Sequence, residues 1–434
     1  MDIPDVRYAR TGGVAIAYQS AGDGPPVVYA PHLCTIDALW RAPHSRAFRD
    51  RLTDDVHLIV FNPRGTGLSD RPRHVTLESR MDDIAAVVDA ENLDPITLLG
   101  VSESANACAL FAATFPERCR NLILFTPYAS VEMDEHERAD WIRSMREHWG
   151  ERAWMEEFAT GINPGYARDP ATMEWFVWMQ RAAASPSAAA AFATLQMDTD
   201  ITDALPSIRV PTVIAYRAED QASALEVARL IPDSTVVEFG GSGIDPYGMP
   251  GDEHGELAEL TVATAIGDPT PEIPDSVLAT LLFTDLTDST VMAAELGDVE
   301  WRRTLTEHHA DVRRELSRFR GTEVDTAGDG FFCRFDGPAR AIGYAHAIVE
   351  AGRTRGLVVR AGVHTGECAV MGSRLAGISV HIGARVLGQA RPGEVLVSRT
   401  VKDLVAGSGI GFDDRGDHAL KGVPGTWQLY AAMP

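Results

Sequence analysis

The sequence predicts two domains of different class: an α/β domain with a helical cap, followed by an α+β domain. With 434 residues, the chain is too long for one ordinary domain. Its first part alternates strand-like apolar runs with stretches of helical spacing, whereas its last part starts with a strand, a long helix and a hairpin. Between these parts, residues 267–276 combine three prolines with acidic residues, which predicts a linker.

The first domain is expected over residues 1–266. Its strand-like runs, in chain order, are PPVVYA, HLIVFN, ITLLGV, NLILFT, PTVIAY and TVVEFG. The intervening stretches Leu77–Glu91 and Asn106–Phe115 have the apolar spacing of helices. Such alternation predicts a mostly parallel sheet with helices on both faces. From about residue 133 to 208 the pattern is purely helical and rich in tryptophan, which predicts a cap over the carboxyl edge of the sheet.

The second domain, over residues 277–434, mixes strands and helices without regular alternation, so an α+β fold is expected. The predicted strands are residues 277–284, the two arms of a hairpin over 321–335, and residues 357–364, 367–371, 394–398 and 427–431. The predicted helices are residues 290–319, 338–353 and 380–387. No internal repeat relates the two domains.

The composition is that of a globular protein that binds neither nucleic acid nor membrane. The formal net charge of −23 argues against both, because an anionic surface would be repelled overall. The five cysteines form no CxxC pair, so neither a disulfide framework nor a zinc site is expected. No apolar run approaches the roughly 18 residues that span a bilayer, and the N-terminus lacks the pattern of a signal sequence. A reduced, cytoplasmic protein is predicted.

Two motifs in the second domain each deliver a carboxylate from the end of an apolar run. LLFTDLTDST carries Asp285 and TAGDGFFCRF carries Asp329, and both lie in turns rich in small polar residues. Mg²⁺ and Mn²⁺ are hard cations that bind through carboxylates and substrate phosphates, so the pair predicts a metal site. The alternatives are that Asp285 caps the following helix and that Asp329 belongs to an Asp-Gly hairpin turn.

In the first domain, LLGVSESANA places Ser102 at a strand-to-helix turn in a Gly-x-Ser-x-Ser context. Together with FNPRGTGLSD and ATFPERCRNLILF, this motif resembles the α/β-hydrolase superfamily over about residues 8–266. The resemblance implies that Ser102 attacks an acyl carbon, with an oxyanion hole from the N–H of Glu103 and one N–H of the Pro31–Cys34 loop. It also implies an acid after a late strand, and Asp220 falls there.

The histidine of the family's triad is missing from its usual place, where Ile244 stands. Because isoleucine cannot accept the proton of Ser102, the domain is expected to have lost hydrolysis and to bind a small ligand under its cap. The alternative is a serine esterase using Ser102, Asp220 and His254, although His254 also fits a surface histidine in an acidic loop. Ser104 replaces the second glycine of the motif and is expected to crowd the approach of helix to strand.

Besides the two aspartate motifs, the second domain contains the motifs VRAGVHTGE and ISVHIGARV. Together they resemble the class III adenylate/guanylate cyclase catalytic domain, which has a ferredoxin-like core, over about residues 277–434. The order of the two domains is that of a multidomain cyclase group of mycobacteria and related actinobacteria. The resemblance implies conversion of ATP to 3′,5′-cyclic AMP and pyrophosphate, with the hydrolase-like domain as a regulator.

By that resemblance, Asp285 and Asp329, with the backbone of Leu286, would hold two Mg²⁺ or Mn²⁺ ions per active site. Backbone N–H groups of the turn that follows would cradle the phosphates of the nucleotide. The residues expected there are Thr287, Ser289 and Thr290.

The helix motif implies two further roles. Arg385 falls on the family's transition-state arginine and would stabilise charge on the α-phosphate, the alternative being an ion pair on the helix surface. His381 stands where an asparagine orients the ribose, and it can still donate a hydrogen bond. In this family one chain supplies the metals and the other the arginine, so a homodimer is implied.

The residues expected to contact the purine are reversed in charge. Asp325 stands where the family has lysine, and Arg374 where it has aspartate. An ionised Asp325 can accept from the adenine amino group while Arg374 donates to a ring nitrogen, which keeps ATP as the expected nucleotide. The alternatives are a cyclase of another base and a pseudo-cyclase that binds nucleotide without turnover.

Overall fold

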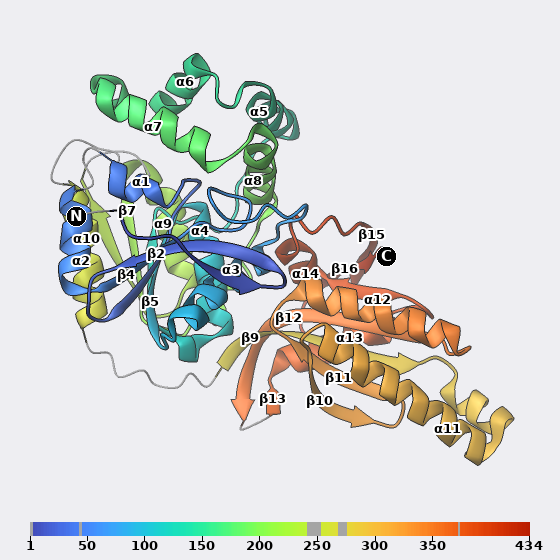
Figure 1. Cartoon of the computed structure of the whole chain (residues 1–434). Coiled ribbons are helices and arrows are strands. Elements are labelled where there is room, and N and C mark those ends of the chain that lie inside the picture. Colours follow the sequence, from blue (N-terminus) through green and yellow to red (C-terminus); the bar gives the residue numbers. More distant parts are fainter. Residues whose placement is uncertain (1–2, 43–45, 241–252, 268–275, 372–373) are drawn as a thin grey trace. The chain divides into compact units, whose positions relative to one another are not determined.

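The computed structural model describes residues 3–42, 46–240, 253–267, 276–371 and 374–434 (Figure 1). The chain divides into two compact units, Met1–Pro274 and Asp275–Pro434. The predicted linker lies almost wholly outside the described residues. No helix in the described ranges is long and apolar enough to cross a membrane.

The first unit is an α/β domain with an eight-stranded sheet. Its strands are β1 Arg7–Thr11, β2 Val14–Ala21, β3 Pro26–Ala30, β4 His57–Phe61, β5 Ile96–Val101, β6 Cys119–Phe125, β7 Thr212–Arg217 and β8 Ser234–Phe239. They are ordered β1-β2-β4-β3-β5-β6-β7-β8. The pairs β1–β2 and β2–β4 are antiparallel and all others are parallel. The predicted strands β3 to β8 are confirmed, whereas the edge hairpin β1–β2 was not predicted.

Helices flank this sheet, and four of them form the predicted cap (Figure 1). Those beside the sheet are α1 Asp37–Arg41, α2 Arg46–Asp55, α3 Leu77–Glu91, α4 Glu103–Thr114, α9 Gln221–Leu230 and α10 Glu253–Ile266. The cap helices are α5 Glu135–His148, α6 Arg152–Ile162, α7 Pro170–Ala183 and α8 Pro186–Asp198. α3 has the predicted bounds. α4 begins three residues earlier than predicted, because the turn at Ser102 leads directly into it.

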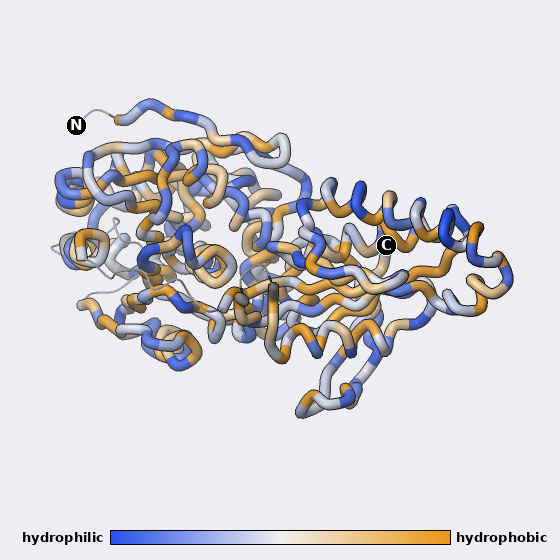
Figure 2. The backbone as a smooth tube through the Cα atoms, turned by 90° about the horizontal axis from the view of Figure 1, so that it is seen from below, coloured by the Kyte–Doolittle hydropathy of each residue, from blue (hydrophilic) through white to orange (hydrophobic). Residues whose placement is uncertain are grey.

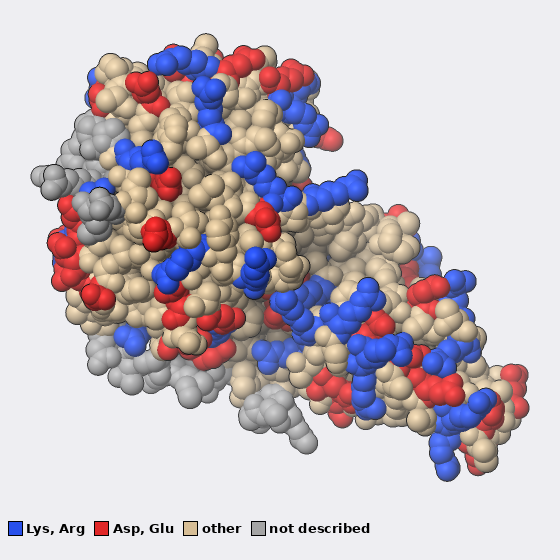
Figure 3. Space-filling model, in the orientation of Figure 1, with Lys and Arg blue, Asp and Glu red and all other residues tan. Residues whose placement is uncertain are grey.

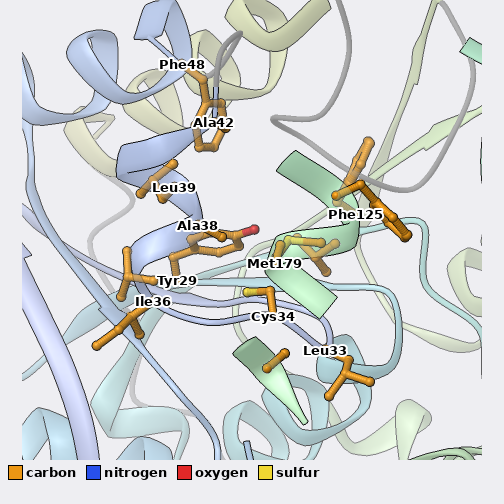
Figure 4. Close-up of a cluster of buried hydrophobic side chains, with 14 of the residues drawn as sticks. Tyr29, Leu33, Cys34, Ile36, Ala38, Leu39, Ala42, Phe48, Phe125 and Met179 are labelled. Carbon is orange, nitrogen blue, oxygen red and sulfur yellow. The ribbon is translucent and has the colours of Figure 1, made fainter. Parts of the chain in front are cut away.

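The cap is joined to the sheet by a shared hydrophobic core. Tyr29 of β3, Phe125 of β6 and Met179 of α7 are buried in one cluster with residues of the loop after β3 (Figure 4). Tyr29 and Phe125 lie near the carboxyl ends of their strands, so the cap covers that edge as predicted. Burial of each such side chain contributes about 1.5–3 kcal/mol relative to exposure, which fixes the cap to the sheet.

The second unit is an α+β domain with a mostly antiparallel sheet. Its strands are β9 Ser276–Leu286, β10 Thr322–Ala327, β11 Gly330–Phe335, β12 Val359–Met371, β13 Arg374–Ala376, β14 Val395–Ser398, β15 Phe412–His418 and β16 Trp427–Ala432. They are ordered β10-β11-β9-β12-β14-β16-β15, with β13 beside β12. The prediction of two strands over 357–371 is wrong, because β12 runs unbroken while it pairs with β9 from Val359 to Ala369. β13 and β15 were not predicted.

The helices of the second unit are α11 Ser289–Arg318, α12 Pro338–Thr354, α13 Ile378–Gln389 and α14 Arg399–Leu404. Hydrophobic residues recur at intervals along the helices, as expected of elements that pack one face on a sheet (Figure 2). The long helix predicted over 290–319 is interrupted at Gly297, which has φ 75° and ψ 161°. α14 was not predicted, since its few residues are too short for a periodic signal.

Candidate functional site

The two predicted metal aspartates lie at the ends of neighbouring strands. Asp285 is the last residue but one of β9, and Asp329 directly precedes β11, which pairs with β9. The N–H of Leu286 donates to Oδ2 of Asp329 over 3.2 Å and so ties the two strand ends together. Asp285 is not the cap of the following helix, because Asp288 takes that position. Asp329 does lie in the hairpin turn between β10 and β11, as its alternative prediction states.

Asp285 is held by an arginine that no motif had indicated. Arg360 of β12 lies directly opposite Asp285 in the antiparallel register. Its Nε donates to Oδ1 of Asp285 over 2.6 Å and its Nη2 to Oδ2 over 2.7 Å. These bonds raise the pKa of Arg360 above its ordinary value. Antiparallel pairing of the two strands, had it been predicted, would have placed this cation beside the carboxylate.

The oxygen atoms at this corner of the sheet are suitable ligands for a hard divalent cation. Carboxylate and backbone carbonyl oxygens are the ligands that Mg²⁺ and Mn²⁺ prefer. Arg360 uses two of the roughly four acceptor positions of the Asp285 carboxylate, so acceptor positions remain for a metal. In the described parts of the chain, no group of three or more His, Cys, Asp or Glu side chains could hold a metal. A metal here would therefore depend on the two aspartates, the backbone and substrate oxygens.

The turn after Asp285 leads into the N-terminus of α11. Thr287 donates its N–H to the carbonyl of Val358 over 2.8 Å, which anchors the turn to the start of β12. Asp288 adopts a left-handed conformation, with φ 57°, and its side chain does not cap the helix. The N–H groups of the first turn, which begins with Ser289 and Thr290, therefore remain available to an anion, which the helix dipole also favours.

α11 also supports the turn that carries Asp329. The ring of His309 packs edge-on against Phe331 with centroids 4.8 Å apart, and its Nε2 lies 3.1 Å from the carbonyl oxygen of Gly328. The neighbouring His308 is buried, and burial lowers its pKa to about 4. The buried imidazole of His308 is therefore neutral at neutral pH and adds no positive charge near Asp329.

α13 lies close to the sheet because the contact between them has one glycine on the helix and one on the sheet. A Cβ on Gly383 of α13 would stand 2.7 Å from the ring of Phe283 on β9. A Cβ on Gly362 of β12 would stand 2.2 Å from the backbone nitrogen of Leu387. Any larger residue at either position must push the helix away from the sheet. The two glycines therefore set the distance between α13 and the strands β9 and β12.

The two predicted functional residues of α13, His381 and Arg385, are both exposed. Arg385 donates from Nε to the carbonyl of Lys421 over 3.0 Å. Within the described ranges it makes no ion pair, so the alternative of a surface salt bridge is not found. Nor does any hydrogen bond of the described residues join it to Asp285 or Asp329 in the same chain.

Only one of the two predicted base-contacting residues can be placed. Asp325 is exposed on β10, next to an irregularity in the pairing with β11, and its carboxylate accepts from the N–H of Thr326 over 2.9 Å. The side chain of Arg374, at the start of β13, lies outside the described residues. Acidic side chains are interspersed among the basic ones on the face of the molecule that Figure 3 shows.

In the first unit, Ser102 forms the turn between β5 and α4. It has φ 51° and ψ −123°, a conformation that residues other than glycine rarely adopt and that is typical of a nucleophile elbow. Gly100 allows the close approach of α4, because a Cβ there would stand 2.8 Å from the Cα of Ala105. Ser104, which was expected to crowd this approach, is buried. Its hydroxyl instead donates to the carbonyl of Pro31 over 2.6 Å and ties α4 to the expected oxyanion loop.

Of the remaining predicted members of the triad, only Asp220 can be placed in the described structure. Asp220 ends a short 3₁₀ turn after β7, and its buried Oδ2 has no hydrogen-bond partner among the described residues. Burial, and then the nearby Glu219, raise its pKa to about 6. Ile244 and the side chain of His254 lie outside the described residues. An orienting acid would hydrogen-bond an imidazole, and Asp220 shows no such bond here.

Comparison with protein families assigns both units. Residues 37–260 match the Alpha/beta hydrolase family, and residues 274–433 match the Adenylate and Guanylate cyclase catalytic domain. The first unit also resembles the enol-lactonase from Burkholderia xenovorans LB400, a solved structure. The TM-score is 0.53 with 16% sequence identity, over 60% of this chain and 100% of that chain. At this identity the likeness concerns the fold alone.

Two curated proteins are similar to separate parts of the chain. A 2-hydroxy-6-oxo-2,4-heptadienoate hydrolase of Pseudomonas putida is 27% identical over 257 residues, which cover 55% of this chain and 88% of that protein. An uncharacterised protein of Mycobacterium tuberculosis is 27% identical over 132 residues, which cover 30% of this chain. The match spans only 35% of the length of the mycobacterial protein.

Proposed function

Because the chain belongs to the α/β hydrolase family and carries an adenylate and guanylate cyclase catalytic domain, we propose that it is a nucleotidyl cyclase with a hydrolase-like regulatory domain. The proposed reaction converts ATP to 3′,5′-cyclic AMP and pyrophosphate. The proposed domain boundaries are 1–266 and 277–434, with the linker between them. The observation that carries the proposal is the junction of Asp285, Asp329 and Arg360 at one corner of a sheet.

In the proposed reaction, the 3′-oxygen of the ribose bonds to the α-phosphorus, the bond to the α–β bridging oxygen breaks, and pyrophosphate leaves. Two Mg²⁺ or Mn²⁺ ions, when bound, would acidify the 3′-hydroxyl and neutralise the triphosphate. Asp285 and Asp329, with the backbone of Leu286, would hold them. The first N–H groups of α11, at Ser289 and Thr290, would receive phosphate oxygens together with the turn at Thr287.

Arg360 would change its binding partner in the course of this reaction. It neutralises Asp285 in the structure described above, so the carboxylate is kept in place before a metal arrives. A metal at Asp285 would weaken this ion pair, and the guanidinium would then be free to bind a triphosphate oxygen. In a protein whose net charge is −23, such local cations are what a nucleotide requires.

The active site is proposed to form between two copies of the chain. Within one chain, Arg385 bonds to Lys421 and not to either aspartate, which supports its action on a nucleotide held by the partner. Arg385 would stabilise charge on the α-phosphate, and His381, exposed on the same helix, would donate to the ribose. A monomer would then be inactive.

ATP is the proposed nucleotide because the residues proposed for the metals and the transition-state arginine match the family's motifs, and base contacts mostly set specificity. Asp325 is exposed and can accept from an amino group, as adenine requires, and Arg374 would donate to a ring nitrogen. A cyclase of another base and a pseudo-cyclase are the competing functions. Both are tested by incubating the purified dimer with Mn²⁺ and each of ATP, GTP, CTP and UTP. Absence of any cyclic product from a folded dimer would refute the proposal.

A serine esterase is the second candidate, because Ser102 has the conformation of a nucleophile elbow. We consider hydrolysis lost, since Ile244 stands where the family has its triad histidine and cannot accept the proton of Ser102. The first unit would then act as a domain that binds a small ligand under its cap. Hydrolysis of a p-nitrophenyl ester decides between them: an esterase loses this activity in Ser102→Ala, whereas an inactive scaffold shows the same background rate in both proteins.

A further inference from the structure

A small cavity lies in the first unit between α3, α4 and the cap helix α8. The residues that line it include Arg80, Glu103, Asn106, Tyr128, Phe192 and Gln196. Taken as a sphere, the void encloses roughly 85 Å³, nearly three times the roughly 30 Å³ that one water occupies. The cavity adjoins the elbow, because Glu103 directly follows Ser102.

The cavity contains a buried cation that lacks a counter-ion in contact. Arg80 of α3 is only 6% exposed, and its guanidinium lies over the ring of Phe192 on α8, 4.5 Å from the centroid. Its Nε has no hydrogen-bond partner, and no ion pair of the described residues includes it. The nearby Asp83 is already paired with Arg64 over 2.7 Å. A buried guanidinium in this state is destabilising unless an anion joins it.

The same cavity exposes two acceptors that lack a donor. Oε1 of Glu103 and Oδ1 of Asn106 are buried without a hydrogen-bond partner, and Asn106 is 2% exposed. Burial raises the pKa of Glu103, whereas His32, Arg80 and a hydrogen bond from Ser102 act in the opposite direction. Each unmet buried polar group lowers the stability of the fold. The lining therefore includes both an anion-binding donor and cation-binding acceptors.

We propose that this cavity binds a small zwitterionic α-amino acid, with its carboxylate on Arg80 and its ammonium on Glu103 and Asn106. The ammonium group brings donors for Glu103 and Asn106, and the carboxylate brings acceptors for Arg80, so the ligand matches these unmet groups in sign. Binding neutralises both buried charges at once, which neither a simple carboxylate nor a simple amine does. The size of the void limits the ligand to glycine, and Phe192 and Leu195 of α8 are among the residues that line it.

This inference rests on the proposal that the first unit binds a ligand under its cap, and not on the cyclase chemistry. Its test is isothermal titration calorimetry of the full chain with glycine, acetate, methylammonium and leucine. Glycine is expected to bind saturably at one site per chain, with each of the other probes at least ten-fold weaker. Cyclase turnover is measured separately, so either proposal can fail alone. No saturable binding of glycine, or acetate binding as tightly as glycine, overturns the inference.

Two variants test the assignment of charges. Arg80→Gln and Glu103→Gln should each weaken glycine binding by about 10- to 100-fold, the effect of one charge-assisted hydrogen bond. Only Glu103→Gln should improve acetate binding, because it removes the carboxylate that repels acetate. Arg152→Gln, at an exposed cap arginine paired with Glu156, is the control and should bind like the wild type. If Arg80→Gln does not fold, Glu103→Gln decides alone: unchanged glycine binding refutes the assignment.

Discussion

Replacement of Arg360 by glutamine separates a functional role of its ion pair from a structural one. The Arg360 and Asp285 side chains are each 30% exposed, so their ion pair contributes only about 0–1 kcal/mol to folding. A charge-assisted hydrogen bond to a triphosphate oxygen contributes about 1.5–3 kcal/mol. Arg360→Gln should therefore leave thermal stability nearly unchanged and lower kcat/KM for the nucleotide by about 10- to 100-fold.

The assay is cyclic nucleotide formation at several Mn²⁺ concentrations, with thermal unfolding measured on the same samples. Because Arg360 competes for Asp285, the variant should need less metal for half-maximal activity although its maximal activity is lower. Arg353→Gln is the matched control, since Arg353 forms a similar two-bond pair with Glu350 on α12. A kcat/KM within two-fold of the wild type, or a loss of stability with normal turnover, would refute the exchange of partners.

Further predictions concern single residues. Asp329→Asn should abolish turnover with little change in the unfolding midpoint, as seen by comparing cyclase assays with circular dichroism melts. Gly362→Ala should cost at least about 1–3 kcal/mol in urea unfolding and reduce turnover, because its methyl group meets the backbone of Leu387. Burial lowers the pKa of His364 to about 3 from 6.5. Between these two pKa values only the unfolded chain binds the proton. The free energy of unfolding should therefore fall by up to about 1.4 kcal/mol per pH unit as the pH drops, and His364→Gln should reduce this dependence on pH.

The fold was predictable where local patterns are long and strong. The strands β3 to β8 and helix α3 follow from apolar runs and spacing alone. The errors arise where pairing between distant segments overrides local signals. β12 continues through a Thr-Gly pair that looks like a turn, because β9 pairs with it on both sides of that pair. Long-range partners of this kind leave no mark on the local sequence.

The candidate site was predictable only in its residue types. Motifs placed Asp285, Asp329 and Arg385, but none of them shows that Arg360 faces Asp285, because that contact depends on the register between β9 and β12. A shift by one residue would send Arg360 to the opposite face of the sheet. Likewise, the motif at Ser102 did not reveal that Arg80 stands unpaired beneath the cap, which depends on the docking of α8.

The strained turn at Ser102 has a role in this protein even if hydrolysis is lost. A residue other than glycine in such a conformation costs about 1–3 kcal/mol, and that cost persists only where the surrounding structure requires it. Here the turn starts α4 at Glu103, so it sets the position of the Glu103 carboxylate and of Asn106 one turn later, both in the cavity. If the elbow served only a former nucleophile, Ser102→Gly would relieve the strain and leave glycine binding unchanged. If the turn and the Ser102 hydroxyl hold Glu103 in place, the same variant should weaken that binding, because the hydrogen bond to the carboxylate is lost.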